Sequence, residues 1–210
     1  MENIPMNQLE KQKKKLGARD IITTAAMLVI CLVIYAITGA LTLPVPFLYL
    51  YCCAGIQGFL CAPFFLVAAN RIGKHGLMFF WAALMGVIQG LSGYMFLLPY
   101  FLLLGGICEL VMIGRNTYRK PVRTGIGWVV YCLGMIIGNA VPLWVAWESY
   151  TQTAAMDGFS NELFEMQMAL VHDPAQMLLA CAITCGLAFL GILFGQRLLR
   201  RHFKKAGVVG

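Results

Sequence analysis

The stretch IITTAAMLVICLVIYAITGALTL, residues 21–43, carries no charged side chain over its whole length. As an α-helix it rises by about 1.5 Å per residue, which is enough to cross the roughly 30 Å hydrocarbon core of a bilayer. A run of lysines and an arginine between residues 11 and 19 precedes it. A cleaved signal peptide is the alternative, but its apolar core would extend over only about 7 to 15 residues. The stretch therefore predicts a retained first membrane span with its basic end in the cytoplasm.

The rest of the chain is also strongly apolar. Of 210 residues, 60% are hydrophobic and only 12% are charged, and such a composition cannot cover a water-soluble globule with polar surface. The sequence therefore predicts an all-α integral membrane protein, built as one transmembrane domain over residues 1–210. Besides 21–43, the spans of a six-helix bundle are expected at about 47–69, 77–91, 94–113, 126–147 and 175–196. Only Ser92-Gly93 marks the turn between the third span and the fourth.

The distribution of charge predicts the topology. All 16 Lys and Arg residues fall in 1–20, 70–76, 114–125 and 197–210, which a six-span chain places on one side of the membrane. The positive-inside rule then predicts a multi-pass protein of a prokaryotic cytoplasmic membrane with both termini in the cytoplasm. The net charge of +7 is explained by anchoring against anionic lipid headgroups, so membrane lipids are expected as partners and nucleic acid is not.

Pairs of glycines predict close packing between the spans. GxxxG occurs in the third, fifth and sixth expected spans, as Gly86 with Gly90, Gly134 with Gly138, and Gly191 with Gly195. Small residues four apart let membrane helices approach closely. The pairs therefore indicate a compact bundle without a wide water-filled pore. Gln57 in the second span is expected to hydrogen bond to a neighbouring helix, with contact to a ligand as the alternative.

Glu109 is the one acid inside an expected span, about one turn from the cytoplasmic end of the fourth. A carboxylate in a membrane helix often marks a function. Because this position is shallow, a structural ion pair with Arg115 or Arg197 is one interpretation and a coupling role is another, with a proton relay as a further alternative.

The long outside loop predicts a short amphipathic helix over about 159–171. Its residues Phe159, Leu163, Met166 and Leu170 recur at helical spacing and share one face, which would lie on the membrane surface or over the mouth of the bundle. Asp173-Pro174 then predicts the start of the sixth span, with the acid as N-cap and the proline at the first helical position.

The sequence predicts no metal site and no cofactor. Its eight cysteines lie within or at the ends of apolar spans. Cys181 and Cys185 share a helix face, but no histidine or second pair accompanies them as a zinc site would require. Buried packing is the interpretation for all eight. The chain has no phosphate-binding loop and no dinucleotide fingerprint, so any ATP that drives its function must be hydrolysed by another chain.

Three segments carry a resemblance to a known family. They are KKLGARDIITTAAMLVICLVIYAITG at 14–39, PYFLLLGGICELVMIGRNTYRK at 99–120 and the basic tail after Gln196. With them, the chain resembles the substrate-binding S components of energy-coupling factor (ECF) transporters, and within these the Trep_Strep or MptD-like family, over nearly its full length.

The resemblance implies a six-helix binding protein that captures a vitamin or related micronutrient on the outer side of the membrane. It also implies docking, through the first helix, onto a coupling transmembrane protein driven by two ATPases. Thr24, Ala25 and Ala26 on the inner half of that helix are then the candidate docking residues, together with Glu109 for coupling. Other S components often have a small-xxx-small face there, whereas in this chain only Ala36 and Ala40, at the outer end, have that spacing.

Two other classes of protein are alternatives. Gly90-Leu91-Ser92-Gly93 matches the GxSG of rhomboid intramembrane proteases, but a serine nucleophile needs a base within hydrogen-bond reach. The only outside histidine is His172, and the family's other motifs are absent, so we expect no enzyme. A stand-alone secondary transporter or channel is the other alternative, although intramembrane charge, its usual mark, is limited to Glu109.

The substrate site is expected at the outer end of the fifth span. Pro142 cannot donate a hydrogen bond to the carbonyl of Gly138, which leaves a polar backbone group beside the amide of Asn139. Aromatic walls with a few polar groups are typical of small-molecule pockets. The candidate residues are Asn139, Trp144, Trp147 and Glu148, with Tyr94 and Tyr100 across from them. The alternative is that the four aromatic residues form an interfacial belt and Asn139 only bonds to a neighbouring helix. A site under the loop helix at 159–170 is the alternative location.

Overall fold

The computed structural model describes residues 17–114 and 117–202, which fold into helices with no strand among them. The longer helices are α2 (Ala18–Thr42), α3 (Cys53–Ile72), α4 (Leu77–Leu91), α5 (Leu97–Val111), α6 (Pro121–Gly138) and α10 (Pro174–His202). A π-helical turn η1 (Leu48–Cys52) leads into α3, and a 3-10 turn η2 (Thr117–Arg119) leads into α6. Three short helices, α7 (Val141–Val145), α8 (Trp147–Met156) and α9 (Asn161–His172), lie between α6 and α10.

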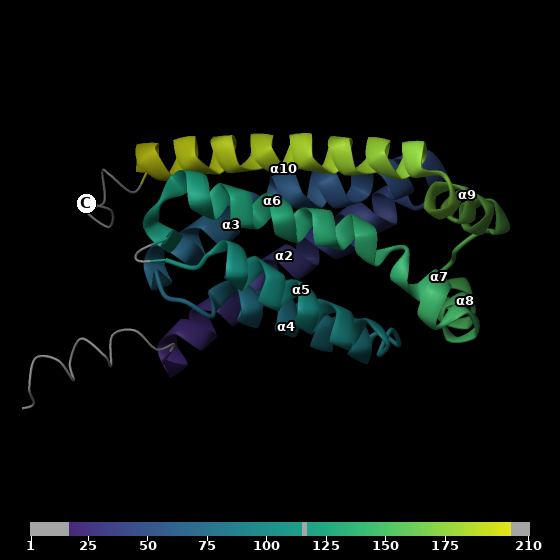
Figure 1. Ribbon diagram of the computed structural model, residues 1–210, viewed down its shortest axis with the longest axis horizontal. Helices are drawn as coiled ribbons and strands as arrows, with labels where there is room; N and C mark the ends of the chain where they lie inside the picture. Colours follow the sequence, from purple (N-terminus) through teal and green to yellow (C-terminus); the bar gives the residue numbers. More distant parts are fainter. Residues whose placement is uncertain (1–16, 115–116, 203–210) are drawn as a thin grey trace, which may run out of the picture.

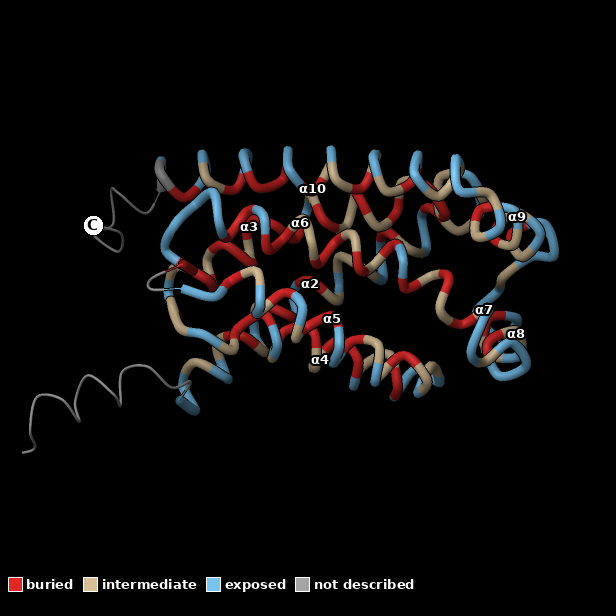
Figure 2. Tube along the Cα trace, viewed as in Figure 1, coloured by how far each residue is buried: buried red, intermediate tan, exposed pale blue. Residues whose placement is uncertain are grey.

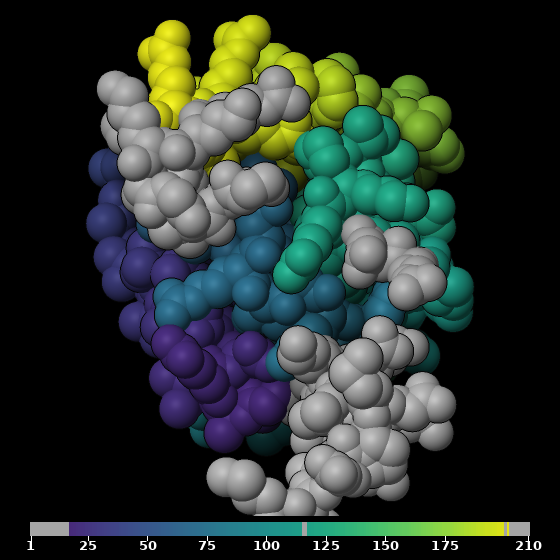
Figure 3. Space-filling view, turned by 90° about the vertical axis from the view of Figure 1, so that its left-hand side faces the viewer, coloured from purple at the N-terminus to yellow at the C-terminus, as the bar shows by residue number. Residues whose placement is uncertain are grey.

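The long helices extend between the two ends of the bundle at different tilts, with α2 and the α4–α5 pair inclined to α10 (Figure 1). α10 packs on α3, and α4 packs on α5. We call one end of this bundle the basic end; it carries Arg71, Lys74, Arg119, Lys120 and Arg123. The start of α2 and the end of α10 both reach it (Figure 3). At the opposite end α7, α8 and α9 gather (Figure 1). We call this the acidic end; it carries Glu148, Asp157, Glu162, Glu165 and Asp173. The charge asymmetry of the sequence is therefore an asymmetry of the folded bundle.

Four helical segments are long and apolar enough to cross a membrane, namely Ala18–Thr42, Leu48–Ile72, Pro121–Gly138 and Pro174–Leu199. The apolar helices α4 and α5 have 15 residues each, which gives about 22 Å at 1.5 Å per residue, less than a full hydrocarbon core. The count of six spans and the cytoplasmic location of the termini remain predictions. Large apolar side chains are exposed along the outer faces, such as Ile22 at 68% and Leu41 at 72%, as lipid contact requires.

The fifth predicted span needs correction. It was expected as one helix over 126–147, but α6 ends at Gly138 and the chain turns at Asn139 and Ala140 before α7. Pro142 at the start of α7 has no N–H to continue the hydrogen-bond ladder. The apolar run continues past this break, which is why hydropathy placed the end of the span too late. The loop helix expected over 159–171 is present as α9, whereas α8 was not predicted.

Buried residues line the inner faces of the long helices, and the exposed ones face outward (Figure 2). Four aromatic rings form the centre of the core. Phe65 stacks on Trp128 with ring centroids 4.6 Å apart, Trp128 stacks on Tyr131 at 5.3 Å, and Trp81 meets Phe65 edge-on at 5.6 Å. All four side chains are 0% exposed. We refer to Phe65, Trp81, Trp128 and Tyr131 as the aromatic plug.

The glycine pairs lie at close helix contacts, which confirms their predicted packing role. A Cβ on Gly191 would lie 2.6 Å from the Cα of Phe59, and one on Gly195 would lie 3.1 Å from the Cα of Pro63, so α10 packs directly on the backbone of α3. Gly86 and Gly134 face side chains of α5 in the same way. Dispersion contacts between closely approached backbones stabilise helix pairs where no hydrophobic effect drives them together.

Replacing Gly191 with alanine is expected to destabilise the protein by about 1 to 3 kcal/mol, because α3 and α10 must move apart to admit the methyl group. Gly186→Ala is the matched control in the same helix, since nothing lies within 4 Å of the Cβ that it adds. Thermal unfolding of both variants in one detergent measures the difference. Equal melting temperatures for the two variants would contradict the close approach of these helices.

Candidate functional site

A cavity lies inside the half of the bundle nearer the acidic end. It has an inner lobe of about 480 Å³ and an outer lobe of about 570 Å³. Both lobes are lined by Tyr35, Gly39, Tyr49, Gln89, Ser92 and Asn139. Because they share these walls, we treat the two lobes as one cavity. Its size is within the range of small-molecule sites in proteins, roughly 300 to 1,000 Å³.

Helical periodicity brings the walls of the cavity together. From α2, Tyr35 and Gly39 point to the cavity at a spacing of four, and from α6 Met135 and Asn139 do the same. Residues four apart lie on one face of a helix. The start of α3 and the end of α4 supply the remaining sides, including Gln57 and Gln89. The cavity therefore forms where inward faces of four helices diverge toward the acidic end.

The polar groups that line the inner lobe are uncharged. The Gln57 amide donates to the Sγ of Cys53 at 3.2 Å and to the carbonyl of Tyr35 at 3.5 Å. This second bond joins α3 to α2, as expected for this glutamine. Within the described part of the chain, no hydrogen bond involves the side-chain amides of Gln89 and Asn139. They face the cavity with their donors and acceptors available, which is what orients a ligand between apolar walls.

The outer lobe is covered by α8, which two polar contacts hold in place. The Tyr94 hydroxyl donates to the carboxylate of Asp157, just after the end of α8. The Tyr150 hydroxyl of α8 donates to Oε1 of Gln167 at 2.7 Å, and Nε2 of Gln167 donates to the carbonyl of Asn139 at 2.9 Å. Burial raises the pKa of Tyr150 to about 12, so this hydroxyl stays a neutral donor at physiological pH. Gln167 therefore connects α8 and α9 to the end of α6.

The aromatic plug lies between the cavity and the basic end. Nε1 of Trp128 donates to the carbonyl of Gly58 at 3.0 Å, which fixes the indole against α3. Because the rings pack without exposed surface, the cavity is closed on that side. The plug therefore blocks exchange of a small molecule with the basic end unless the helices rearrange.

Of the predicted site residues, some line the cavity and the others lie outside it. Asn139 and Tyr94 line the cavity. Tyr100 packs on Gly138 and donates its hydroxyl to the carbonyl of Gly134 at 2.6 Å, so it supports α6 from behind. Trp144 is 66% exposed and Trp147 44%.

These two tryptophans and Glu148, which is exposed, are not among the lining residues. Sequence reasoning missed Tyr35, Tyr49 and Gln89. The available signal was a polar side chain within an apolar span, and it gives no direction around the helix.

Ser92, the residue behind the protease alternative, is exposed at the end of α4 and lines both lobes of the cavity. His172 is exposed at the end of α9, and its Nδ1 bonds to the carbonyl of Met168 at 2.8 Å. Among the described residues no hydrogen bond joins Ser92 to a histidine. The expectation that the protein is not an enzyme stays a prediction.

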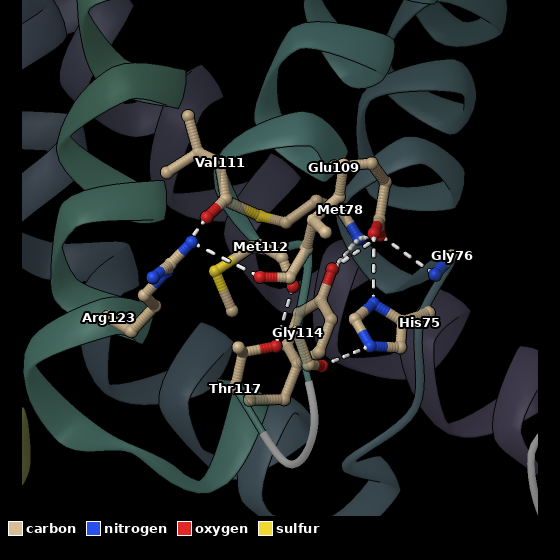
Figure 4. Close-up of polar contacts among 11 residues, drawn as sticks. His75, Gly76, Met78, Glu109, Val111, Met112, Gly114, Thr117 and Arg123 are labelled. Atoms are coloured by element: carbon tan, nitrogen blue, oxygen red, sulfur yellow. Dashed lines mark hydrogen bonds and ion pairs between the residues drawn. The ribbon is translucent and has the colours of Figure 1, made fainter.

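Glu109 caps the start of α4 (Figure 4). Its Oε1 accepts hydrogen bonds from the backbone N–H groups of Gly76 at 2.8 Å and Met78 at 3.0 Å, and from the hydroxyl of Tyr118. Its Oε2 lies 3.8 Å from Nδ1 of His75. A carboxylate at this place satisfies free amides and the positive end of the helix dipole.

An ion pair of Glu109 with Arg115 or Arg197 was predicted, and the structure describes only the second of these arginines. Arg197 is exposed on α10, and no ion pair joins it to Glu109 within the described ranges. Arg115 lies outside the described residues. The structural role expected of the carboxylate is therefore met by backbone amides. Its role in coupling remains a prediction.

The candidate docking residues lie in the first turns of α2. Thr24 is buried and donates its hydroxyl to the carbonyl of Asp20 at 2.9 Å, Ala25 is half-buried and Ala26 is exposed. Asp20 is in turn paired with Lys74 in the α3–α4 loop, which ties the start of α2 to the basic end. Of the three candidates, Ala26 is the one on the outer surface.

Removing the Glu109 carboxylate is expected to loosen the start of α4. Glu109→Ala should lower the free energy of unfolding by about 2 to 3 kcal/mol, because it leaves two backbone amides without their charged acceptor. Tyr118→Phe removes the hydroxyl's bonds to Glu109 and to the N–H of Met78 but leaves the carboxylate on both amides, so it should cost less. Hydrogen exchange at Gly76 and Met78 measures the local effect. Unchanged protection of these amides in Glu109→Ala would exclude the capping role.

Comparison with protein families identifies the chain as a member of one of them. The model of a family described as a hypothetical bacterial integral membrane protein (Trep_Strep) matches residues 18–205, and the chain belongs to this family. No curated protein and no solved structure matches the chain.

Proposed function

We propose that this member of the Trep_Strep family is the substrate-binding S component of an ECF-type importer. It binds a small micronutrient, such as a vitamin, from the outer side of the cytoplasmic membrane. A coupling transmembrane protein and two ATPases then deliver the substrate inward. The resemblance in the sequence first suggested this role, and family membership establishes that the chain is an integral membrane protein.

The observation that carries the proposal is the one-sided cavity. Its walls, size and unpaired amides suit a small molecule. The aromatic plug closes the bundle below it, and a closed bundle favours a binding protein over a channel. If the acidic end faces outward, as the positive-inside rule predicts, the cavity is accessible from the side on which nutrients arrive.

The residues of the chain favour an energy source that lies in other chains. Its sequence has no nucleotide-binding loop, and in the described parts of the chain no group of three or more His, Cys, Asp or Glu residues could hold a metal ion. The intramembrane carboxylate that a proton-driven carrier would use, Glu109, is occupied by backbone amides and Tyr118. These features favour a binding component that depends on ATPases in other chains.

The test of this role is transport with and without partners. Affinity purification of the tagged chain from native membranes should recover a coupling protein and two ATPases. In liposomes the complex should take up a compound that the purified chain binds, and only with ATP. Replacing Ala26 by tryptophan should reduce recovery of the partners, with Val33→Trp, farther along the exposed face of α2, as a comparison. Uptake by the chain alone, driven by an ion gradient, would instead establish a secondary transporter.

The topology has its own test. In a variant without its eight cysteines, a cysteine at the exposed position Glu162 should react with a membrane-impermeant maleimide on intact cells. A cysteine at the exposed position Lys120 should react only after lysis, because the basic end is expected to face the cytoplasm. The opposite labelling pattern would place the cavity on the cytoplasmic side and overturn import by outside capture.

A further inference from the structure

We propose that the cavity binds a flat heteroaromatic compound without negative charge, held at its edge by the amides of Gln89 and Asn139 and at its outer end by the carboxylate of Asp157. The inference rests on the proposed function and narrows it to a class of ligand. It comes from the juxtaposition of unpaired amides, tyrosine walls and a single carboxylate in one cavity.

The charges around the cavity exclude an anionic ligand. Neither lobe is lined by a Lys, Arg or His, and Asp157 is the one acid that lines them. The acidic end around the outer lobe also carries Glu148, Glu162, Glu165 and Asp173. A phosphate or carboxylate group would therefore lose its hydration without gaining a cationic partner, at a large cost in free energy. The same field lowers the local concentration of anions and raises that of cations.

The walls of the cavity suit a planar ring. Tyr35 and Tyr49 line both lobes, and the ring of Tyr49 meets Phe159 edge-on at a centroid distance of 5.4 Å. In the outer lobe, the ring centroids of Tyr94 and Tyr150 lie 6.1 Å apart. Aromatic faces bind flat, polarisable rings by stacking and edge contacts. An extended aliphatic ligand would not use these faces.

The edge of the ring must carry hydrogen-bonding groups. Each of the amides of Gln89 and Asn139 offers both a donor and an acceptor. Gln89 belongs to α4, and Asn139 lies in the turn that follows α6. A ligand that covers these amides without pairing them loses affinity, because buried polar groups without partners are costly. A heterocycle with a lactam or amino-imine edge matches them, whereas a plain hydrocarbon ring does not.

Asp157 marks the outer end of the ligand. Its Oδ2 accepts from the Tyr94 hydroxyl, and a carboxylate has further acceptor sites. A ring nitrogen, amine or hydroxyl that reaches the outer lobe can therefore donate to it. A positively charged group gains most, since it also benefits from the surrounding acids.

The experiment measures binding to the purified chain in lipid nanodiscs by calorimetry. The probes are matched pairs that differ in negative charge: riboflavin and its 5′-phosphate, thiamine and its monophosphate, pyridoxine and its 5′-phosphate, guanosine and its 5′-monophosphate, and nicotinamide and nicotinate. In parallel, the protein is dialysed against a bacterial metabolite extract, and the retained compounds are identified by mass spectrometry. This second arm covers ligands outside the panel.

The retained ligand is expected to be a heteroaromatic compound without negative charge. Its phosphorylated or carboxylated counterpart should bind at least about 100-fold more weakly, as expected for an unpaired buried charge. Gln89→Ala should weaken binding by about 5- to 100-fold, while Gln152→Ala, at an exposed glutamine of α8, should not. Asp157→Asn should weaken binding of a cationic ligand more than that of a neutral one.

The outcomes separate this inference from the proposed function. An anionic or aliphatic ligand whose binding is lost in Gln89→Ala would overturn the ligand class and leave the binding role intact. If the wild type retains no compound, or binds every retained compound no more tightly than Gln89→Ala does, the cavity is not a substrate site, and the proposed function fails with the inference.

Discussion

The contact between Trp128 and Gly58 keeps the half of the bundle nearer the basic end densely packed. The indole N–H reaches the carbonyl of Gly58 at 3.0 Å, and it can do so because glycine has no side chain to hold the helices apart. A Cβ at this position would lie 2.8 Å from the Sγ of Cys132 in α6. With α3 and α6 this close, Phe65 and Tyr131 pack against Trp128, and the interior below the cavity is filled. Interiors packed in this way resist small displacements and change by discrete rearrangement.

The cavity in the other half depends on the end of α6. If α6 continued to residue 147, a straight helix would extend past the bundle and leave the outer lobe open. The turn at Asn139 instead directs the chain sideways into α7 and α8, and Gln167 satisfies the carbonyl that the turn exposes. An irregular backbone at this depth is tolerated where its polar groups find partners or line a cavity. One break in a helix therefore creates both the roof of the cavity and one of its polar walls.

The sequence predicted the helices better than the site. The residues of α4 and the start of α10 at Pro174 agree with the expected bounds, because turns, caps and charges mark them in the chain. The end of α6 was missed because apolar residues continue beyond it. For the site, Asn139 was predicted from the nearby Pro142, and Tyr94 from its place at the outer end of a span. Gln89 and Tyr35 were not predicted. In a soluble helix, apolar periodicity shows which face is buried, whereas a helix that is apolar all round does not distinguish a cavity from lipid. Trp144 illustrates this limit, since its indole is largely exposed.

Closure of the bundle by the aromatic plug has an energetic consequence for the proposed importer. A ligand can shift a conformational equilibrium only by the difference between its affinities for the two states. A substrate that binds well in the present cavity stabilises the conformation in which the aromatic plug closes the bundle. Binding alone therefore opposes inward release. In the proposed importer, release then requires a partner that binds the rearranged conformation of the bundle more tightly than the conformation described above. The basic end is where such a partner would act, and there Glu109 joins the start of α4 to Tyr118 before α6. These bonds connect the basic ends of two helices, α4 and α6, that also line the cavity. A partner that displaced them would act on both helices, which would link one end of the bundle to the affinity of the site at the other.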